Sequence, residues 1–226
     1  MNNKILRFLI NNRGFFVFVV CLGVFRTAVA DWNPIPSGSM RPNLLEGDVV
    51  FVNRLAYQIK VPLTDIVLAQ YSQPQRGDIV VFTSPKDGVR LIKRVVGLPG
   101  DVIEMRSDIL FINGEQAAYT DPTQLVETVG AGHDIDALRL TESIAGHSRR
   151  VQLLANIDTY STFGPVTVSA DHFWMMGDNR DNSFDSRGYG VVPKHLISGH
   201  AVRVLVSADI LTNWMPRFER FGAKLE

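Results

Sequence analysis

Val-Arg-Leu-Ile-Lys-Arg-Val-Val, residues 89–96, is the stretch that decides the fold class of this sequence. It is short, rich in β-branched and aliphatic residues, and followed by Gly97, which is the pattern of a β-strand. Successive side chains of a strand point to opposite faces, so Lys93 and Arg94 should face different sides. One of the two cations therefore points into the protein if the sheet packs on that side.

Further runs of the same kind lie on both sides of this stretch, rich in Val, Ile and Phe and bounded by Gly, Pro and Asp. They cover residues 48–53, 77–82, 102–105, 109–112, 166–168, 172–176 and 201–206. Residues 106–108, and then Asn113-Gly114, predict tight turns between such runs. The sequence therefore predicts a mainly β fold with antiparallel sheets. Residues 115–160 are more polar and less regular, and we expect an inserted region with weaker strand signals there.

The composition is that of a globular protein, and it excludes several functions. The 226 residues carry 23 basic and 23 acidic side chains, a balance that does not favour nucleic acid as a partner. The single cysteine, Cys21, lies in an apolar run, which excludes a disulfide framework and a thiolate metal site. The five histidines lack the i, i+4 pairing of a helical metal site. We therefore expect neither a metal nor a cofactor.

The N-terminal region is first basic and then apolar. Residues 1–13 contain three basic side chains and no acidic one, which predicts a cytoplasmic N-terminus with the remainder translocated. One interpretation is a cleavable signal peptide, with residues 28–30 (Ala-Val-Ala) as the cleavage site. The other is a membrane anchor over residues 14–32, which is short against the roughly 20 residues of a span unless Arg26 extends to the outer interface. Local features slightly favour the signal peptide.

Two hydroxyls flank a glycine in Ser37-Gly38-Ser39, which lies between Pro36 and Pro42. The prolines fix φ and disfavour a helix, so a rigid extended loop is expected. The glycine permits the close approach of another backbone. Such a loop could present a serine nucleophile, although an ordinary surface turn has the same composition.

A serine nucleophile requires a base, and none of the histidines lies in a recognisable triad motif. Lys93 is the alternative, because it lies within an apolar strand pattern. Burial can lower a lysine pKa by about 3–5 units from about 10.4, which leaves a neutral amine that can accept a proton. The alternative is a lysine without a chemical role, whose amine extends from the strand to solvent.

Residues 177–190 are the second unusual stretch, Gly-Asp-Asn-Arg-Asp-Asn-Ser-Phe-Asp-Ser-Arg-Gly-Tyr-Gly. The acids alternate with Arg180 and Arg187, which predicts a loop held by ion pairs and side-chain hydrogen bonds. The alternative is a charged loop exposed to solvent.

Four blocks of the sequence together resemble the bacterial type I signal peptidases, also called leader peptidases. The blocks are residues 35–44, 76–82, 92–101 and 177–187. They follow one another in the order and with about the spacing of that family, and the resemblance extends from residue 35 to about residue 200. It implies a serine protease with a Ser-Lys dyad that removes signal peptides from exported proteins.

The resemblance also implies a role for each matching residue. Ser39 would be the nucleophile and Lys93 the general base, while Ser37 and the backbone N–H of Ser39 would form the oxyanion hole. Ser183 would hydrogen-bond the lysine amine and orient it. The remaining charged residues of the last block would support the site: Asp178, Arg180, Asp185 and Arg187.

Substrate and topology follow from the same resemblance. The substrate would bind as an extended strand with small residues at positions −1 and −3 in shallow apolar pockets. Met40, Leu91 and Ile92 are candidates for the pocket lining, and equally good candidates for the core. Because tethering raises the effective concentration of enzyme near a membrane-embedded precursor, function favours an uncleaved anchor. We expect a monomer in the bacterial inner membrane, single-pass, with the catalytic domain periplasmic, acting on signal-peptide-bearing precursors in contact with membrane lipid.

The expected organisation has five parts. They are a cytoplasmic segment (1–13), a transmembrane anchor (14–32), a catalytic core (33–101 and 172–208), an inserted β-rich domain (102–171) and an amphipathic C-terminal tail (209–226) whose apolar residues fall at about helical spacing.

Three alternatives were weighed against the general signal peptidase. A specialised precursor peptidase, for example in conjugative transfer, would use the same dyad. A membrane-tethered β module that binds peptides without chemistry would not need both Ser39 and Lys93. A self-cleaving repressor-type regulator is disfavoured by the translocated topology and the lack of a DNA-binding segment.

Overall fold

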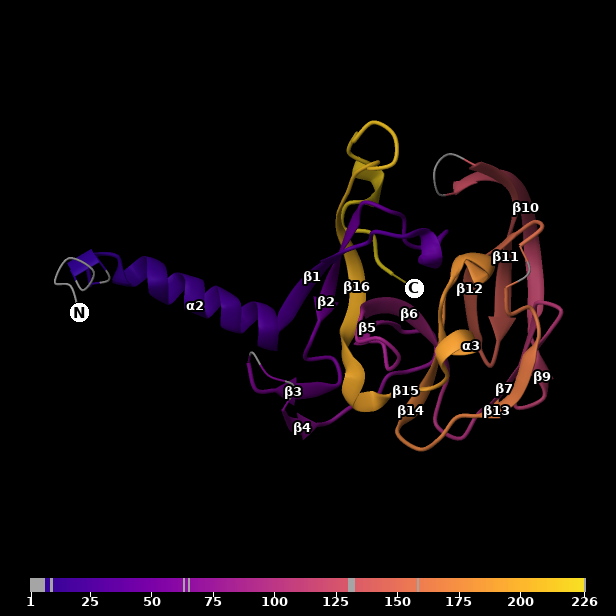
Figure 1. The fold of residues 1–226 in the computed structure, drawn as a ribbon, viewed down its shortest axis with the longest axis horizontal. Coiled ribbons are helices and arrows are strands. Elements are labelled where there is room, and N and C mark those ends of the chain that lie inside the picture. The colour runs from indigo at the N-terminus through magenta and orange to yellow at the C-terminus, as the bar shows by residue number, and fades with distance from the viewer. Residues whose placement is uncertain are drawn as a thin grey trace.

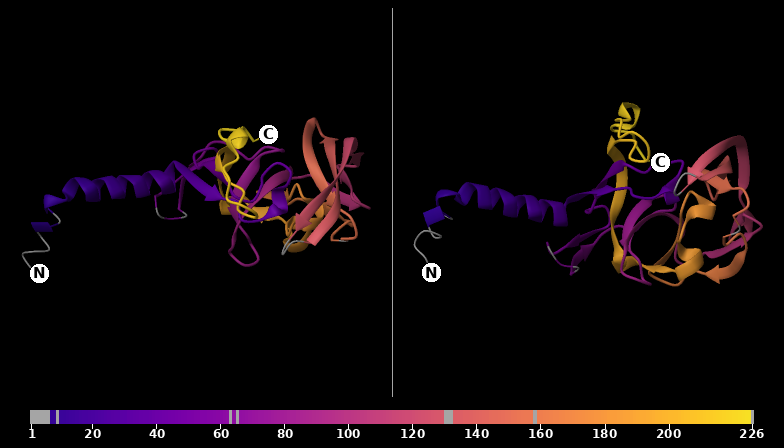
Figure 2. Two further views of the ribbon diagram at one scale, coloured as in Figure 1. Left: turned by 90° about the horizontal axis from the view of Figure 1, so that it is seen from above. Right: turned by 45° about the horizontal axis from the view of Figure 1, so that its top comes forward.

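The computed structural model describes residues 7–8, 10–62, 64, 66–129, 133–157 and 159–225. Its body is built from β-sheets, and every pair of neighbouring strands in them is antiparallel. The prediction of a mainly antiparallel β fold is therefore confirmed. Helix α2 (Arg13–Ala28) projects away from this body toward the N-terminus in two perpendicular views (Figures 1 and 2).

The largest sheet has seven strands in the order β1-β2-β16-β5-β6-β14-β15. Its strands are β1 (Ala30–Pro34), β2 (Asp48–Asn53), β5 (Ile79–Thr83), β6 (Arg90–Gly97), β14 (His172–Met176), β15 (Val192–Pro193) and β16 (Ile197–Ser207). The last strand of the sequence, β16, lies between two early strands, β2 and β5. The sheet therefore brings β6 next to β14, which leads into the polar stretch at residues 177–190.

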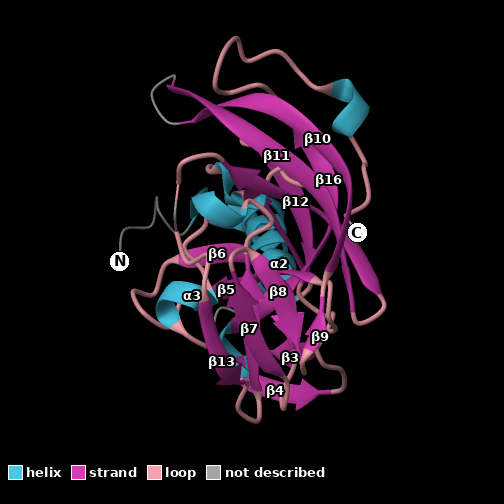
Figure 3. Ribbon diagram, turned by 90° about the vertical axis from the view of Figure 1, so that its right-hand side faces the viewer, coloured by secondary structure: helices cyan, strands magenta, loops and turns pink. Residues whose placement is uncertain are grey.

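The smaller sheets come mainly from the middle of the chain. A four-stranded sheet contains β13 (Phe163–Thr167), β7 (Val102–Arg106), β8 (Ile109–Ile112) and β9 (Glu115–Gln116), in that order. A three-stranded sheet contains β10 (Ala118–Val129), β11 (His133–Ile144) and β12 (His147–Leu154). Strands β3 (Gln58–Lys60) and β4 (Val67–Gln70) form a separate pair. We refer to β10, β11 and β12 as the inserted sheet; it lies to the right of the seven-stranded sheet in Figure 1, and Figure 3 views it from that side.

The inserted sheet has long strands, although the strand signals in the sequence of residues 115–160 are weaker. Two of its strands are twelve residues long, and the third has eight. Their sequence is polar because many of their positions are exposed, whereas Ala137, Glu142 and Val151 are buried against the core. Long pairing therefore gives these strands a stability that their local composition does not indicate.

The expected anchor segment, residues 14–32, is divided in the structure. Helix α2 ends at Ala28, and β1 pairs with β2 from Ala30 onward. Asp31, the second residue of β1, is buried, and its carboxylate accepts hydrogen bonds from Arg26 at 2.9 Å and Arg90 at 3.1 Å. Among the described residues, no helix combines the length and the apolar character needed to cross a membrane.

The apolar residues of the C-terminal tail fall at about helical spacing, with Pro216 as an interruption. After β16 the tail is an irregular segment with a single 3₁₀ turn, Phe218–Arg220. Pro216 interrupts any helix, and arginine side chains attach the segment to the core instead. Arg217 donates to the carbonyl of Glu46 at 2.9 Å, and Arg220 pairs with the buried carboxylate of Asp48.

Candidate active site

We refer to residues 35–44, which contain the proposed nucleophile Ser39, as the nucleophile loop. It begins where the chain leaves β1. Backbone hydrogen bonds attach Ile35 to the start of β2, from Ile35 N–H to the Asp48 carbonyl at 2.8 Å and from Gly47 N–H to the Ile35 carbonyl at 2.9 Å. The chain then forms one 3₁₀ turn, Gly38–Met40, which contains Ser39. The expectation of an extended loop is therefore wrong for Gly38–Met40, because the prolines lie outside this turn and do not prevent its Arg41 N–H to Gly38 carbonyl hydrogen bond.

Ser39 and Lys93 meet at the centre of the site. Lys93 Nζ lies 2.6 Å from Ser39 Oγ, and the two residues are 3% and 9% exposed. Burial lowers the pKa of Lys93 to about 8, although the nearby charges of Asp185 and Asp178 oppose this shift. Roughly a tenth of the amine is therefore neutral at pH 7, against almost none for a lysine with the ordinary pKa of about 10.4.

The neighbouring cation, Arg94, has a different environment. Its guanidinium makes two hydrogen bonds to the carboxylate of Asp178, at 2.9 and 2.8 Å, and donates to the Gly77 carbonyl at 2.7 Å. Arg94 and Asp178 are both about 1% exposed, so this is a buried bidentate ion pair. The side chain of Asn43 completes it by donating to Asp178 at 2.7 Å.

The polar stretch at residues 177–190 binds the nucleophile loop directly. Asn179 donates its side-chain amide to the Gly38 carbonyl at 3.0 Å and its backbone N–H to the Ser39 carbonyl at 3.1 Å. Gly177 is required for this close approach, since a Cβ there would lie 2.5 Å from the Ser39 carbonyl oxygen and 2.2 Å from Ser183 Oγ. Sequence reasoning assigned a role to neither residue, although both lie in the block that carried the resemblance.

Ser183 lies in a hydrogen-bonded group around Asp185. Its hydroxyl donates to Asp185 at 2.7 Å, and the same carboxylate accepts from the Gly177 N–H at 2.9 Å and from Arg187 at 2.8 Å. Burial alone would raise the pKa of Asp185, but the hydrogen bonds and charge of Arg187 lower it, so Asp185 is ionised. The expected hydrogen bond from Lys93 to Ser183 stays a prediction.

Ser37, the second hydroxyl of the loop, is exposed and precedes the 3₁₀ turn in an extended conformation. It lines an open cleft of about 800 Å³ together with Gly38, Arg41 and Asn182, and residues of the C-terminal tail lie opposite. The cleft therefore gives solvent-side access to the loop that contains Ser39.

The three candidate pocket residues lie on two sides of β6. Met40 is fully buried in a cluster that Ile92 also contacts. Leu91 packs against a different cluster, which contains Val95. This division agrees with alternation along the strand, because Leu91, Lys93 and Val95 share one face and Ile92 and Arg94 share the other. Their role in substrate binding stays a prediction.

The inserted sheet contacts the site through Glu142. This carboxylate is 0% exposed and pairs with Arg180 from the polar stretch at 2.6 Å and with Arg149 of β12. Tyr119 of β10 also donates to it at 2.8 Å. Burial opposes ionisation of Glu142, but the two arginines lower its pKa to about 2. Arg180 therefore links its loop to the inserted sheet, a contact that only the fold reveals, and its support of the site stays a prediction.

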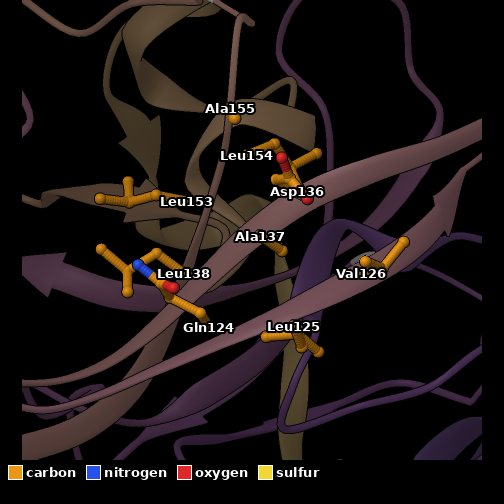
Figure 4. Close-up of a pocket in the computed structure, with 9 residues that line it drawn as sticks. All are labelled: Gln124, Leu125, Val126, Asp136, Ala137, Leu138, Leu153, Leu154 and Ala155. Carbon is orange, nitrogen blue, oxygen red and sulfur yellow. The ribbon is translucent and has the colours of Figure 1, made fainter.

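A separate hollow lies within the inserted sheet, away from the dyad (Figure 4). Its volume is about 630 Å³, and its lining comes from β10, β11 and the end of β12. The lining residues are Gln124, Leu125, Val126, Asp136, Ala137, Leu138, Leu153, Leu154 and Ala155. Asp136 is the ionisable side chain among them, and the hollow contains no nucleophile-base pair comparable to Ser39 and Lys93.

The family follows from the sequence as a whole. The family model described as "Signal peptidase, peptidase S26" matches residues 9–206. The chain belongs to this signal peptidase family. As a family member it is a peptidase, which agrees with the buried serine and lysine at its centre.

Signal peptidases from several bacteria are similar to it. Signal peptidase I of Pseudomonas fluorescens is 37% identical over 223 residues, covering 93% of this chain and 77% of the relative. Signal peptidase I of Pseudomonas aeruginosa is 34% identical over 225 residues with the same coverages. A crystal structure of a signal peptidase I from Enterococcus faecalis V583 is 28% identical, with a TM-score of 0.35, and covers 58% of this chain and 98% of that one.

Proposed function

We propose that this signal peptidase cleaves N-terminal signal peptides from exported precursors after small-x-small sites, with Ser39 as nucleophile and neutral Lys93 as general base. The observation that carries the proposal is the buried 2.6 Å contact between Lys93 Nζ and Ser39 Oγ, together with the low pKa of Lys93. Family membership supports the reaction class.

The reaction requires four proton transfers through one amine, two in acylation and two in deacylation. Neutral Lys93 accepts the Ser39 hydroxyl proton as Oγ attacks the scissile carbonyl. The resulting ammonium then protonates the leaving amine, which leaves an acyl-enzyme on Ser39. Water attacks this ester with the regenerated neutral amine as base, and Ser39 recovers its proton when the signal peptide leaves.

The oxyanion that forms in each step requires donors fixed in advance. The backbone N–H of Ser39 and the hydroxyl of Ser37 fill this role in the proposed mechanism. Attachment of the nucleophile loop at Ile35 and at Asn179 supports it, because a rigid loop does not need to reorganise during the reaction. One such donor typically contributes about 2.7–4 kcal/mol.

Ser183 would orient the base by accepting a hydrogen bond from Lys93. A serine hydroxyl has one donor and two acceptor positions, and the donor of Ser183 is already used on Asp185. Ser183 can therefore act only as an acceptor toward the amine. This arrangement would leave the lone pair of Lys93 directed at Ser39.

For the substrate, we propose that Met40, Leu91 and Ile92 help to limit the −1 and −3 side chains to small ones. Half-burial of Leu91 on the same face of β6 as Lys93 supports this role, and Ile92 would act from the opposite face through its contact with the cluster that contains Met40. Full burial of Met40 next to the nucleophile makes it a floor for such a pocket rather than a direct contact.

We also propose that helix α2 attaches the enzyme to the inner membrane as a single-pass anchor with the catalytic domain periplasmic. The large apolar side chains of α2 are exposed to solvent, including Phe15, Phe18, Val20 and Phe25, at 48–64%. Exposure of so many apolar side chains outside the body is unfavourable in water and favourable in lipid. Membrane fractionation combined with N-terminal sequencing tests this anchor against cleavage after Ala30.

Cleavage of a precursor by the purified full chain in detergent tests the chemistry. Ser39→Ala and Lys93→Met should each reduce kcat/KM by at least about 10³-fold, because each removes a partner of the proton transfer. Lys224→Met, at an exposed lysine, is the matched control and should cleave normally. Wild-type activity in the Lys93→Met variant would disprove the mechanism.

A further inference from the structure

A cationic hollow lies between the seven-stranded sheet and the inserted sheet, on the Arg94 side of β6. Its volume is about 330 Å³. The charged and titratable side chains around it are Arg76, Arg94, Arg149, His147, His200 and Asp78. Arg76 is paired with Asp101 at 2.9 Å. Asp78 accepts hydrogen bonds from the Tyr57 hydroxyl at 2.6 Å and the Gln75 N–H at 2.9 Å.

Arg149 is the unusual member of this group. Its side chain is 2% exposed, and one of its terminal nitrogens pairs with Glu142. Within the described part of the chain, its Nε and Nη1 atoms are buried and have no hydrogen-bond partner. A buried donor without an acceptor costs about 1–3 kcal/mol, and more when it carries charge, so these N–H groups favour a site for an acceptor.

The buried charges next to the hollow do not balance. Three arginines, Arg94, Arg149 and Arg180, share two carboxylates, Asp178 and Glu142. All five are 5% exposed or less. Burial lowers the pKa of Arg149, and the charges of Arg180 and Arg94 lower it further against the attraction of Glu142. Asp78 also lines the hollow, but its carboxylate accepts from Tyr57 and Gln75 and lies 3.8 Å from His200 Nε2. Nε and Nη1 of Arg149 still lack an acceptor among the described residues.

We propose that the hollow binds a small inorganic anion, such as phosphate or chloride, on the free N–H groups of Arg149. His147 lies at the mouth, where its ring is 3.3 Å from the position of a Cβ on Gly77, and it supplies a further N–H. The anion would lie between Arg149 on β12 of the inserted sheet and Arg94 of the catalytic core, which both line the hollow. Its effect is on the stability of the docked sheet, and it is independent of the cleavage reaction.

Thermal unfolding of the full chain in a neutral detergent tests the site, at constant ionic strength, as phosphate or chloride replaces gluconate. We expect a saturable rise in Tm for the wild type with either anion. Arg149→Lys keeps the charge but removes the Nε and Nη1 donors, so it should lose the rise. Arg150→Lys, the adjacent residue on the other face of β12, is the matched control and should keep it.

Calorimetric titration of phosphate keeps the proposal testable if Arg149→Lys does not fold. His147 is exposed, so His147→Ala should fold normally and bind phosphate about three- to tenfold more weakly than the wild type. Absence of saturable phosphate or chloride binding to the wild type would overturn the proposal. An equal rise in Tm for the wild type and Arg149→Lys would overturn it as well, because it would indicate non-specific screening.

Discussion

Lys93 and Arg94 are neighbours on β6, but the two sides of that strand provide opposite environments. On one side, Lys93 lies 2.6 Å from a neutral hydroxyl and its pKa falls to about 8. On the other side, Arg94 makes a bidentate ion pair with Asp178. Burial without a directly bonded carboxylate leaves a base that can lose its proton, whereas burial with one leaves a fixed structural charge.

The largest change in stability should come from Arg94. Arg94→Met leaves the carboxylate of Asp178 buried without its counter-ion, and should destabilise the protein by about 3–5 kcal/mol. Chemical denaturation at pH 7 measures this effect. Arg106→Met, which breaks the exposed Glu104 pair, is the matched control and should change stability by less than about 1 kcal/mol. Similar losses of stability in the two variants would mean that the buried Arg94 ion pair contributes no more than the exposed Arg106 pair.

Lys93→Met should stabilise the folded protein, whereas Arg94→Met destabilises it. The folded pKa of Lys93, about 8, lies below the unfolded value of about 10.4, so the unfolded state binds more protons between these values. The lysine therefore destabilises the folded state fully below pH 8, and this penalty disappears as the pH rises to about 10.4. The variant should be more stable than wild type by about 3 kcal/mol at pH 7, converging with it at high pH.

Denaturation curves at pH 7, 9 and 10.5 measure this difference. Lys224→Met, at an exposed position, should show no such trend. A constant difference across the three pH values would mean that the amine of Lys93 is not desolvated in the folded protein.

Ser183→Ala tests how the amine of Lys93 is oriented on its side of β6. Ser183→Ala removes an acceptor proposed for the amine, so kcat should fall about ten- to hundredfold, corresponding to about 1.5–3 kcal/mol, with little change in KM. Ser186→Ala is the matched control, because Ser186 is a buried serine of the same stretch that accepts from the Met175 N–H instead. A change confined to KM would assign Ser183 to substrate binding.

The smallest effect expected is the pH dependence of the wild-type enzyme. With a pKa of about 8, roughly a tenth of Lys93 is neutral at pH 7. The value of kcat/KM should therefore rise about tenfold from pH 7 to a plateau above pH 9. A profile already flat from pH 6 upward would contradict the role of a titrating lysine.

Much of the site was predictable from sequence because its chemistry lies in short motifs. The pattern of residues 89–96 predicted a strand and the separation of Lys93 from Arg94, and Ser37-Gly38-Ser39 predicted a constrained loop. The roles of Asn179 and Glu142 were not predictable. Each depends on a contact between segments distant in sequence, Asn179 with Gly38 and Glu142 with Arg180.

The sequence by itself determined the β class, the family and the pair of residues with the chemistry of a dyad, since these follow from alternation and from motifs. Tertiary structure decided the rest. It divided the expected anchor segment between Ala28 and Ala30, formed the long strands β10 and β11 where the strand signals are weaker, and attached the C-terminal tail to the core through arginine contacts. It also brought Lys93 into buried contact with Ser39, because the pKa of the lysine depends on burial and on partners that only the folded chain brings together.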